Sequence, residues 1–226
     1  MQKIIFGLLL GLPLMHCQTV PQTETKPLAF DSTLAAELAE MEELDQIAAY
    51  IPQGEYKEWP LEKWQNFKDS VFTSHQNRVQ EIFRAKGYPG FNLVGETGEG
   101  DFWVMVQHAD KNPAFQKEVL DALKIEVDDR NANPNHYGLL MDRYLLNTGD
   151  KQRYGTQVMY HQDSCIAMPR PLEDSLRVNE RRMELGMEPI EVYLNGMAEM
   201  HFRINQAHFE TKGISEPTLY PVADQD

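Results

Sequence analysis

Apolar residues recur at helical spacing through most of the chain after residue 30, in segments that begin near Pro and end near Gly. The clearest segment covers residues 60–86, where Pro60 suits the first helical turn and Gly87 suits the residue after the last turn. Comparable patterns predict helices over residues 31–49, 113–127, 135–147, 174–185 and 189–208. The spacing therefore predicts a mainly α domain, built from local contacts and in no need of a disulfide.

Three segments depart from this pattern. Residues 154–168 alternate in polarity before two prolines, which predicts one short β-hairpin. Residues 101–110 begin with a plausible helix cap, Asp101, and an apolar run from Phe102 to Val106, which predicts a short buried helix. Residues 91–100 are rich in glycine and lack the Lys-Ser/Thr pair of a phosphate-binding loop, so we expect an irregular, flexible loop there. The predicted fold is a single globular domain of six or seven helices and one hairpin over residues 31–208, followed by a loose acidic tail, 209–226.

The N-terminal residues resemble an export signal. Lys3 precedes a run of twelve mainly apolar residues, which is too short to span a membrane because a spanning helix needs about 20. We therefore predict a signal peptide over residues 1–16. Leu14 lies three residues before Cys17, as in a bacterial lipobox, so Cys17 is the predicted lipidation site and residues 17–30 the predicted tether. This predicts an exported protein that is lipid-anchored in the bacterial cell envelope; a secreted or periplasmic protein is the alternative.

Charge and cysteine content narrow the classes of function. Lys plus Arg number 21 against 35 Asp plus Glu, a net charge of −14. This balance argues against nucleic-acid binding and against a polybasic membrane surface, so the N-terminal lipid is the only membrane contact we expect. Once Cys17 is lipidated, Cys165 has no partner in the chain. Because Cys165 lies in an apolar setting, a buried inert thiol is favoured over a nucleophile.

Ionisable residues at positions where apolar residues are expected are the best candidates for a functional site. Burying an unpaired charge costs several kcal/mol, so such a residue needs a partner or a role. His108 comes just after a run of five apolar residues, with Gln107 between them, and opens the segment His-Ala-Asp, which ends at Asp110. His108 is either a general base or a core histidine bonded to a backbone carbonyl. Asp110 is either its carboxylate partner or a cap for the helix over 113–127.

Other polar residues extend this candidate site. Asp45 and His75 lie on the apolar sides of their predicted helices, either as a buried structural pair or as part of a site. The segments around Asp142 and Gln152 are denser in hydrogen-bonding groups than a loop requires. Arg143 can anchor a carboxylate or phosphate, or can tie a loop to a helix. The predicted catalytic residues are His108 and Asp110, and the predicted ligand-binding residues are Asp45, His75, Gln107, Asp142, Arg143, Gln152, Tyr154 and Gln157.

No pattern in the sequence names a metal or a cofactor. There is no HExxH motif, no pair of CxxC motifs and no carboxylate cluster at ligand spacing. The adjacent Arg181 and Arg182 lie on a predicted helix in an acidic protein, and we expect them to form intramolecular salt bridges. The cofactor and the partner, whether a small molecule or an envelope component, stay open at this point.

Several short strings, in order along the chain, form a recognisable set. They are Asp45-Gln46, Gln107-His108-Ala109-Asp110 with Pro113 and Phe115-Gln116, Asp142-Arg143, Gln152 with Tyr154-Gly155-Thr156-Gln157, Pro171, Arg181-Arg182, Gly186 and Pro189. Their order and spacing resemble an uncharacterised bacterial family known as domain of unknown function 6624, over about residues 34–194. The resemblance implies a mostly helical domain, often found in exported proteins or lipoproteins, and it implies no activity. The final helix and tail lie outside the matched span.

Two functions fit these observations. In the first, the domain is a binding or interaction module with a polar pocket around the His-Ala-Asp segment. In the second, it is a hydrolase-like enzyme in which His108 is the general base, Asp110 or Asp45 orients it, and Arg143 with Gln157 holds an anionic substrate. The enzyme hypothesis requires His108, a carboxylate and a polar anchor to converge on one cleft.

Overall fold

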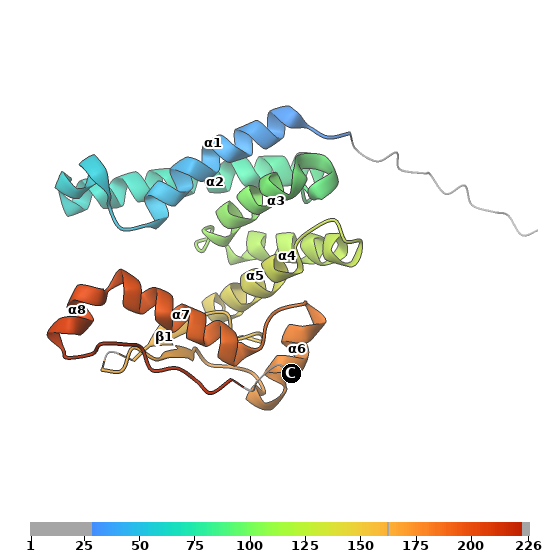
Figure 1. The fold of residues 1–226 in the computed structure, drawn as a ribbon. Helices are drawn as coiled ribbons and strands as arrows, with labels where there is room; N and C mark the ends of the chain where they lie inside the picture. The colour runs from blue at the N-terminus through green and yellow to red at the C-terminus, as the bar shows by residue number, and fades with distance from the viewer. Residues whose placement is uncertain (1–28, 162, 223–226) are drawn as a thin grey trace, which may run out of the picture.

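The computed structural model describes residues 29–161 and 163–222 (Figure 1). The predicted signal peptide, the lipidation site Cys17 and nearly all of the predicted tether lie outside the described residues. No helix in the described part of the chain is long and apolar enough to cross a membrane.

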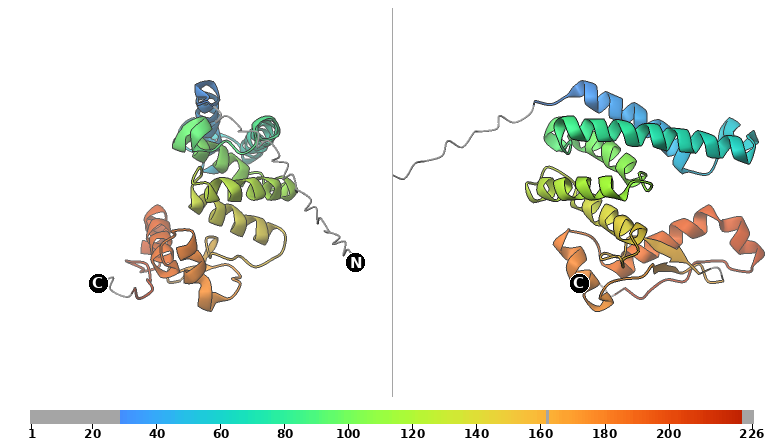
Figure 2. Two further views of the ribbon diagram at one scale, coloured as in Figure 1. Left: turned by 90° about the vertical axis from the view of Figure 1, so that its right-hand side faces the viewer. Right: turned by 180° about the vertical axis from the view of Figure 1, so that it is seen from behind.

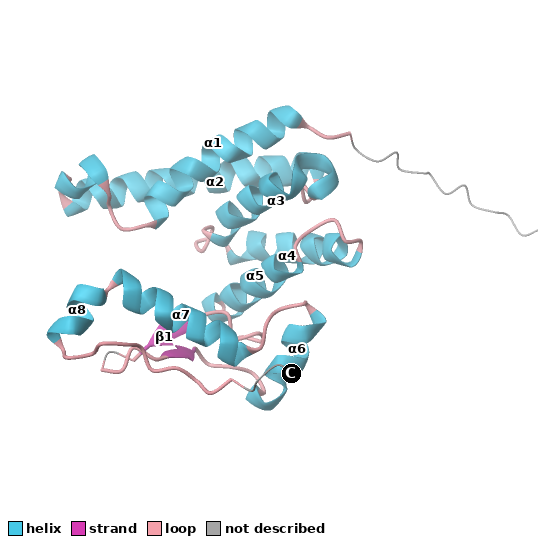
Figure 3. Ribbon diagram, viewed as in Figure 1, coloured by secondary structure: helices cyan, strands magenta, loops and turns pink. Residues whose placement is uncertain are grey.

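The described residues form a mainly helical fold, as the sequence predicts (Figure 3). Within them are eight α-helices, because the predicted final helix is broken into two. The α-helices are α1 (Ser32–Ala49), α2 (Leu61–Lys86), α3 (Phe91–Gln107), α4 (Pro113–Asp128), α5 (Pro134–Asn147), α6 (Val178–Glu184), α7 (Ile190–Ile204) and α8 (Gln206–Thr211). Two short 3-10 helices, η1 (Gly54–Glu58) and η2 (Ser175–Arg177), precede α2 and α6.

The predicted hairpin is present as one small antiparallel sheet. Strand β1 (Val158–Tyr160) pairs with β2 (Ala167–Pro169), and Met159 lies opposite Met168. The sheet lies beside α7 in the lower half of the molecule (Figure 1). The sequence therefore placed this short β element correctly among the helices.

The glycine-rich segment is helical, and the expectation of an irregular loop over 91–100 was wrong. Helix α3 begins at Phe91, and Gly95 interrupts it with a φ of 76°. The side chains of Leu93 and Val94 are buried in the core, and Glu99 is buried as well. Packing of α3 against α1 therefore outweighs the low helix propensity of the glycines.

The C-terminal helices also begin and end differently from the prediction. The predicted helix 174–185 starts as η2, and α6 begins only at Val178, since Asp174 has a left-handed φ of 39°. Helix α7 ends before Asn205, whose side chain donates to the carbonyl of His201, and α8 follows. Part of the tail expected to be loose is bound: the hydroxyl of Tyr220 donates to the Ala167 carbonyl at 2.9 Å.

Two apolar clusters make up the interior of the described residues. The larger one lies among α1 to α5 and contains Leu38, Phe102 and Leu123. The smaller one gathers Ala167 of β2, Val178 of α6 and residues of α7. The views in Figure 2 show α6, α7 and the hairpin stacked below α5 as a layer apart from α1 and α2. The candidate site lies in the larger, N-terminal half.

Candidate functional site

A fully buried carboxylate, Asp45, joins the three N-terminal helices. It lies on α1, and its two oxygens face the histidines of two other helices. His75 Nδ1 of α2 lies 3.4 Å from Asp45 Oδ1, and His108 Nδ1 at the end of α3 lies 2.5 Å from Asp45 Oδ2. Asp45 and His75 therefore meet, and Asp45 is the carboxylate bonded to the ring of His108.

The protonation of this cluster follows from its geometry. Burial opposes ionisation of Asp45, but the hydrogen bonds and positive charge of His108 and His75 outweigh it, so the pKa of Asp45 lies below its ordinary value. An ionised carboxylate can only accept hydrogen bonds, so each histidine carries a hydrogen on Nδ1. In the neutral form of His108, the lone pair is then on Nε2, which is the arrangement of an oriented base.

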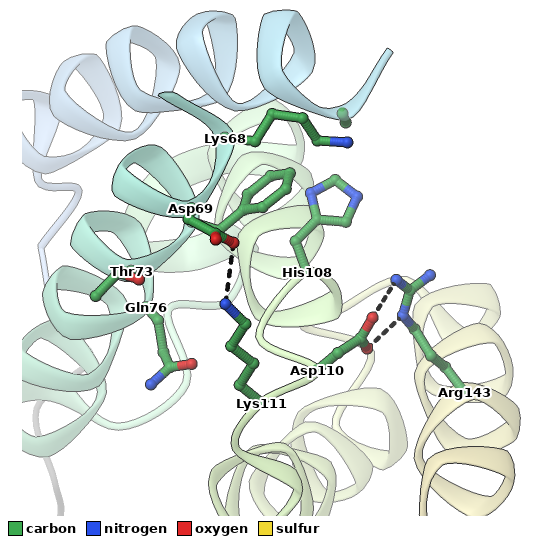
Figure 4. Close-up of a pocket in the computed structure, with 10 residues that line it drawn as sticks. Lys68, Asp69, Thr73, Gln76, His108, Asp110, Lys111 and Arg143 are labelled. Atoms are coloured by element: carbon green, nitrogen blue, oxygen red, sulfur yellow. Dashed lines mark hydrogen bonds and ion pairs between the residues drawn. The ribbon is translucent and has the colours of Figure 1, made fainter. Parts of the chain in front are cut away.

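His108 lines an open cavity of about 420 Å³ at the junction of α2, α5 and the turn after α3 (Figure 4). The ring of His108 is about 15% exposed and packs against Phe72, at 5.3 Å between ring centroids. The cavity is lined by Ala49, Lys68, Asp69, Phe72, Thr73, Gln76, His108, Asp110, Lys111 and Arg143. His108 is thus not sealed in the core, and its ring forms no hydrogen bond to the backbone of any residue that the structure describes.

Five of the ten residues that line this cavity have charged side chains. Arg143 forms two hydrogen bonds of 2.7 Å to Asp110, and Lys111 pairs with Asp69 at 3.0 Å. Lys68 forms no ion pair with any residue that the structure describes, and Figure 4 shows its ammonium group on the same side as the His108 ring. Counting the lining groups other than His108 gives three cations and two carboxylates, so the cavity is locally cationic in a protein of net charge −14.

Asp110 contacts Arg143 rather than His108. Partial burial opposes ionisation of Asp110, but the hydrogen bonds and charge of Arg143 lower its pKa below the ordinary value. Asn147 adds a third hydrogen bond, at 2.8 Å. Asp110 does not cap α4 either, because Asn112 is the N-cap and accepts from the Phe115 backbone N–H. Of the two carboxylates proposed to orient His108, only Asp45 is bonded to it.

The predicted residues in the second half of the chain lie in a different place and are engaged with the backbone. The buried carboxylate of Asp142 accepts from the backbone N–H groups of Arg153, Tyr154 and Thr156 at 2.7 to 3.0 Å. Burial raises the pKa of Asp142, although these donors act in the opposite direction. These contacts fix the segment after α5 against that helix.

Gln152 organises the same segment. Its side-chain amide donates to the carbonyls of Gln157 and Arg170 and accepts from the Gln157 N–H, each at 2.9 Å. Tyr154 is buried nearby, and burial raises its pKa to about 12. None of these residues lines the His108 cavity, and neither does Gln107. The structure thus brings His108, Asp110 and Arg143 to one cavity and leaves Asp142, Gln152, Tyr154 and Gln157 apart from it.

Sequence reasoning missed the residues that α2 contributes. Asp69, Phe72, Thr73 and Gln76 follow each other at helical spacing on one face, and Lys68 lies beside them. The face is mostly polar, and a polar helix face is ordinarily just solvated. The spacing was visible in the sequence, but nothing distinguished this face from other polar faces until α3 and α5 were packed beside it.

Two other predictions have clear structural outcomes. Cys165 is fully buried, its thiol approaches the Ala198 carbonyl at 3.7 Å, and burial raises its pKa, as expected of an inert thiol. Arg181 and Arg182 form no salt bridge with any described residue, so the expected intramolecular pairs were wrong. Both instead donate to backbone carbonyls, including that of Tyr154. Within the described residues, no group of three His, Cys, Asp or Glu side chains is placed to hold a metal.

The fold and the site together define the class of this protein. It is a mostly helical domain with an acid–histidine cluster beside an open cavity. The chain belongs to the family described as Family of unknown function (DUF6624), which matches residues 32–203. This span includes α1 to nearly the end of α7 and therefore the whole of the His108 cavity. Comparison with curated proteins and with solved structures finds no match.

Proposed function

We propose that this protein is a ligand-binding module whose His108 cavity takes a small anionic molecule. The observation that carries the proposal is the cationic wall of the cavity in a strongly acidic chain. A site surrounded by negative surface needs its own local cations to attract an anion. Lys68, Lys111 and Arg143 provide them, and the volume of about 420 Å³ is within the range of small-molecule sites.

The donors of the cavity are not all used within the protein. Arg143 binds Asp110 through Nε and Nη2, and its Nη1 forms no hydrogen bond to a described residue. Lys68 has no ionic partner among those residues. Together these two groups offer a guanidinium edge and an ammonium to a carboxylate or phosphate group. Asp110 then acts as the group that holds Arg143 in position.

A thermal-shift screen tests the proposal directly. Purified protein is heated with inorganic phosphate, sulfate and a panel of small carboxylates, because a ligand that binds only the native state must raise the melting temperature. We expect one class of anion to raise the melting temperature in a saturable way and Lys68→Ala to remove the effect. Lys151→Ala removes an equal charge at an exposed position outside the cavity, so it should leave the shift unchanged. Equal loss of the shift in both variants would contradict the proposal.

A hydrolase is the second candidate, and the Asp45–His108 hydrogen bond favours it. With Nδ1 bonded to an ionised carboxylate, Nε2 of neutral His108 can accept the proton of an attacking water. The cations of the wall would hold the anionic part of the substrate. The same arrangement serves a binding site as well, since an oriented imidazole also donates or accepts a hydrogen bond.

Turnover distinguishes the two functions. Chromogenic phosphate and carboxylate esters are incubated with the protein and with His108→Gln, which keeps a hydrogen-bonding side chain but removes the base. Hydrolysis that is lost in His108→Gln while anion binding persists supports the enzyme. If the unmodified protein binds an anion but hydrolyses neither class of ester, the result supports the ligand-binding module.

We further propose that the domain acts in the bacterial cell envelope, attached through Cys17. Leu14 three residues before Cys17 and the apolar run before it support this location. Cys17→Ala should release the protein from membranes and abolish incorporation of labelled fatty acid. If the variant still carries lipid, another residue is the attachment site and the lipobox assignment is wrong.

A further inference from the structure

A second cavity lies between the first half of α5, α6 with the turn after it, and α7. Its volume is about 370 Å³, and it shares no lining residue with the His108 cavity. It is lined by Asn135, Leu139, Arg182, Gly186, Met187, Glu188 and Tyr193. This volume lies near the lower end of the range of small-molecule sites, and the lining is partly polar and partly apolar.

Arg182 places a buried positive charge in the wall of this cavity. Only 1% of Arg182 is exposed, yet no carboxylate of the described residues lies within ion-pair distance of it. Nη1 donates to the Tyr154 carbonyl at 2.7 Å and Nε donates to the Glu188 carbonyl at 2.6 Å. The guanidinium also lies over the ring of Tyr193, 4.9 Å from its centroid. Its remaining nitrogen, Nη2, forms no hydrogen bond to a described residue.

The charge of Arg182 is therefore incompletely balanced inside the protein. A buried cation is normally paired with an anion, because transfer from water costs several kcal/mol. Backbone carbonyls and an aromatic face offset part of that cost but provide no negative charge. An anionic group bound in the cavity would complete the pair.

Two further groups of the wall lack partners within the described residues. The Oδ1 atom of Asn135 is buried without a hydrogen bond. Glu188 lies exposed at the rim, and its carboxylate forms no hydrogen bond or ion pair with a described residue, although its backbone carbonyl accepts from Arg182. Each of these oxygens accepts an N–H donor. The cavity thus combines a site for a carboxylate with sites for a positively charged donor.

We propose that this second cavity binds a small zwitterion with one carboxylate and one ammonium group, of the amino-acid class. Arg182 takes the carboxylate, while Glu188 and the Asn135 carbonyl oxygen take the ammonium. Leu139, Met187 and the Tyr193 ring are available for an apolar side chain. A dianionic phosphate fits less well, because one guanidinium faces it and Glu188 would repel its second charge.

This proposal is independent of the function assigned to the His108 cavity. The two cavities have different lining residues. The wall of the first suits an anion, whereas the wall of the second suits a molecule with one negative and one positive group. A ligand of the second cavity should therefore compete with no anion at the first, and failure of either proposal leaves the other standing.

Binding of individual amino acids to the full chain tests the proposal. Each of the common L-amino acids is titrated by calorimetry, with acetate, methylammonium and inorganic phosphate as single-charge and dianion probes. We expect one group of related amino acids to bind saturably and acetate or methylammonium alone to bind at least tenfold more weakly. No saturable binding by any amino acid, or displacement of a bound amino acid by a lower concentration of inorganic phosphate, overturns the proposal, whereas phosphate that binds without displacing the amino acid occupies a different site.

Variants of the wall locate the bound molecule. Arg182→Lys removes bonds to two carbonyls and can fail to fold, so Glu188→Gln and Asn135→Leu are the decisive changes. Each should weaken the amino acid about tenfold or more, which is the loss of roughly one charge-assisted hydrogen bond. Glu184→Gln, exposed on α6 and outside the cavity, is the matched control and should bind as the unmodified protein does. Equal affinity in Glu188→Gln, Asn135→Leu and the control would place any bound amino acid elsewhere and refute the assignment.

Discussion

Arg143 and Asp110 are joined side by side, with Nε on Oδ1 and Nη2 on Oδ2, both at 2.7 Å. The sequence suggested Arg143 as an anion anchor and Asp110 as a partner of His108. Their pairing links the two roles, because the carboxylate that steadies the guanidinium also competes with any anion for it. If the His108 cavity binds an anion as proposed, we expect Asp110 to set part of the affinity.

Asp110→Asn should strengthen anion binding at the His108 cavity. Neutralising one of the two lining carboxylates raises the net positive charge of the wall, and we expect a severalfold gain in affinity for the anion that stabilises the protein most. The pair is about a quarter to two-fifths exposed, so stability should change by less than about 1 kcal/mol. Calorimetric titration measures the affinity. Asp121→Asn, which breaks an exposed pair outside the cavity, should leave the affinity unchanged. A loss of affinity in Asp110→Asn would show that holding Arg143 in position outweighs the competition with the anion, and would contradict this prediction.

Asp45→Asn should destabilise the N-terminal helices. The substitution removes a fully buried charge that two histidines contact, and we expect the free energy of unfolding to fall by about 2 to 4 kcal/mol. The melting temperature should drop by several degrees, as differential scanning calorimetry can measure. An unchanged melting temperature together with loss of anion binding would assign Asp45 to the site alone.

The stabilising effect of Asp45 should depend on pH in a defined direction. Its native pKa lies below the ordinary value of 3.8, so the ionised form contributes stability above that value and the contribution is lost as the pH falls through the native pKa. The difference in unfolding free energy between the unmodified protein and Asp45→Asn should therefore narrow below about pH 3.8. Urea denaturation at a series of pH values measures it. A difference that grows on acidification would show that the native pKa is raised instead.

Asp142→Ala should affect stability without affecting the His108 cavity. It leaves the N–H groups of Arg153, Tyr154 and Thr156 without their buried acceptor, at an expected cost of about 3 kcal/mol. Anion affinity should stay the same, since Asp142 does not line that cavity. Asp150→Ala, a nearby exposed position, is the control for stability. A specific loss of anion affinity in the folded Asp142→Ala protein would restore this residue to the candidate site.

Two glycines of α3 should respond oppositely to alanine. Gly95 has a φ of 76°, a conformation that an L side chain adopts only with strain, so Gly95→Ala should lower stability by about 1 kcal/mol. Gly100 lies within the helix, and a Cβ there would meet nothing closer than 3.7 Å, so Gly100→Ala should raise stability by about 0.5 to 1 kcal/mol. Chemical denaturation measures both, and a stabilising Gly95→Ala would show that the kink relaxes.

The sequence singled out the three residues of the acid–histidine cluster but did not show that they meet or how they pair. Asp45, His75 and His108 each stood out as ionisable residues on apolar helix sides, and such residues need partners wherever the helices pack. Choosing between Asp45 and Asp110 for His108 required knowing that α1 lies against α3. A high density of hydrogen-bonding residues was an ambiguous signal. It occurs in a loop that is held by side chains such as Asp142 and Gln152, and it occurs equally in a ligand site.

The fold was predictable where apolar periodicity was strong and poorly predictable where glycine was frequent. Helix α2 follows its stripe from Leu61 to Lys86, as expected. The first part of helix α3 was not predictable in this way, because burial of Leu93 and Val94 decides its conformation. That burial depends on neighbouring helices, which the spacing of residues along the sequence does not reveal. The same limit applies to Tyr220, whose hydrogen bond to the Ala167 carbonyl binds a segment that composition alone predicted to be loose.

The division of the interior into two apolar clusters has a spectroscopic consequence. All three tryptophans of the chain, at positions 59, 64 and 103, lie on or beside the N-terminal helices, and the smaller cluster around α7 contains none. Indole fluorescence therefore monitors only one of the two halves. A sample in which the α7 half had melted by itself would still emit like native protein, and only tyrosine signals or far-ultraviolet dichroism would register the loss.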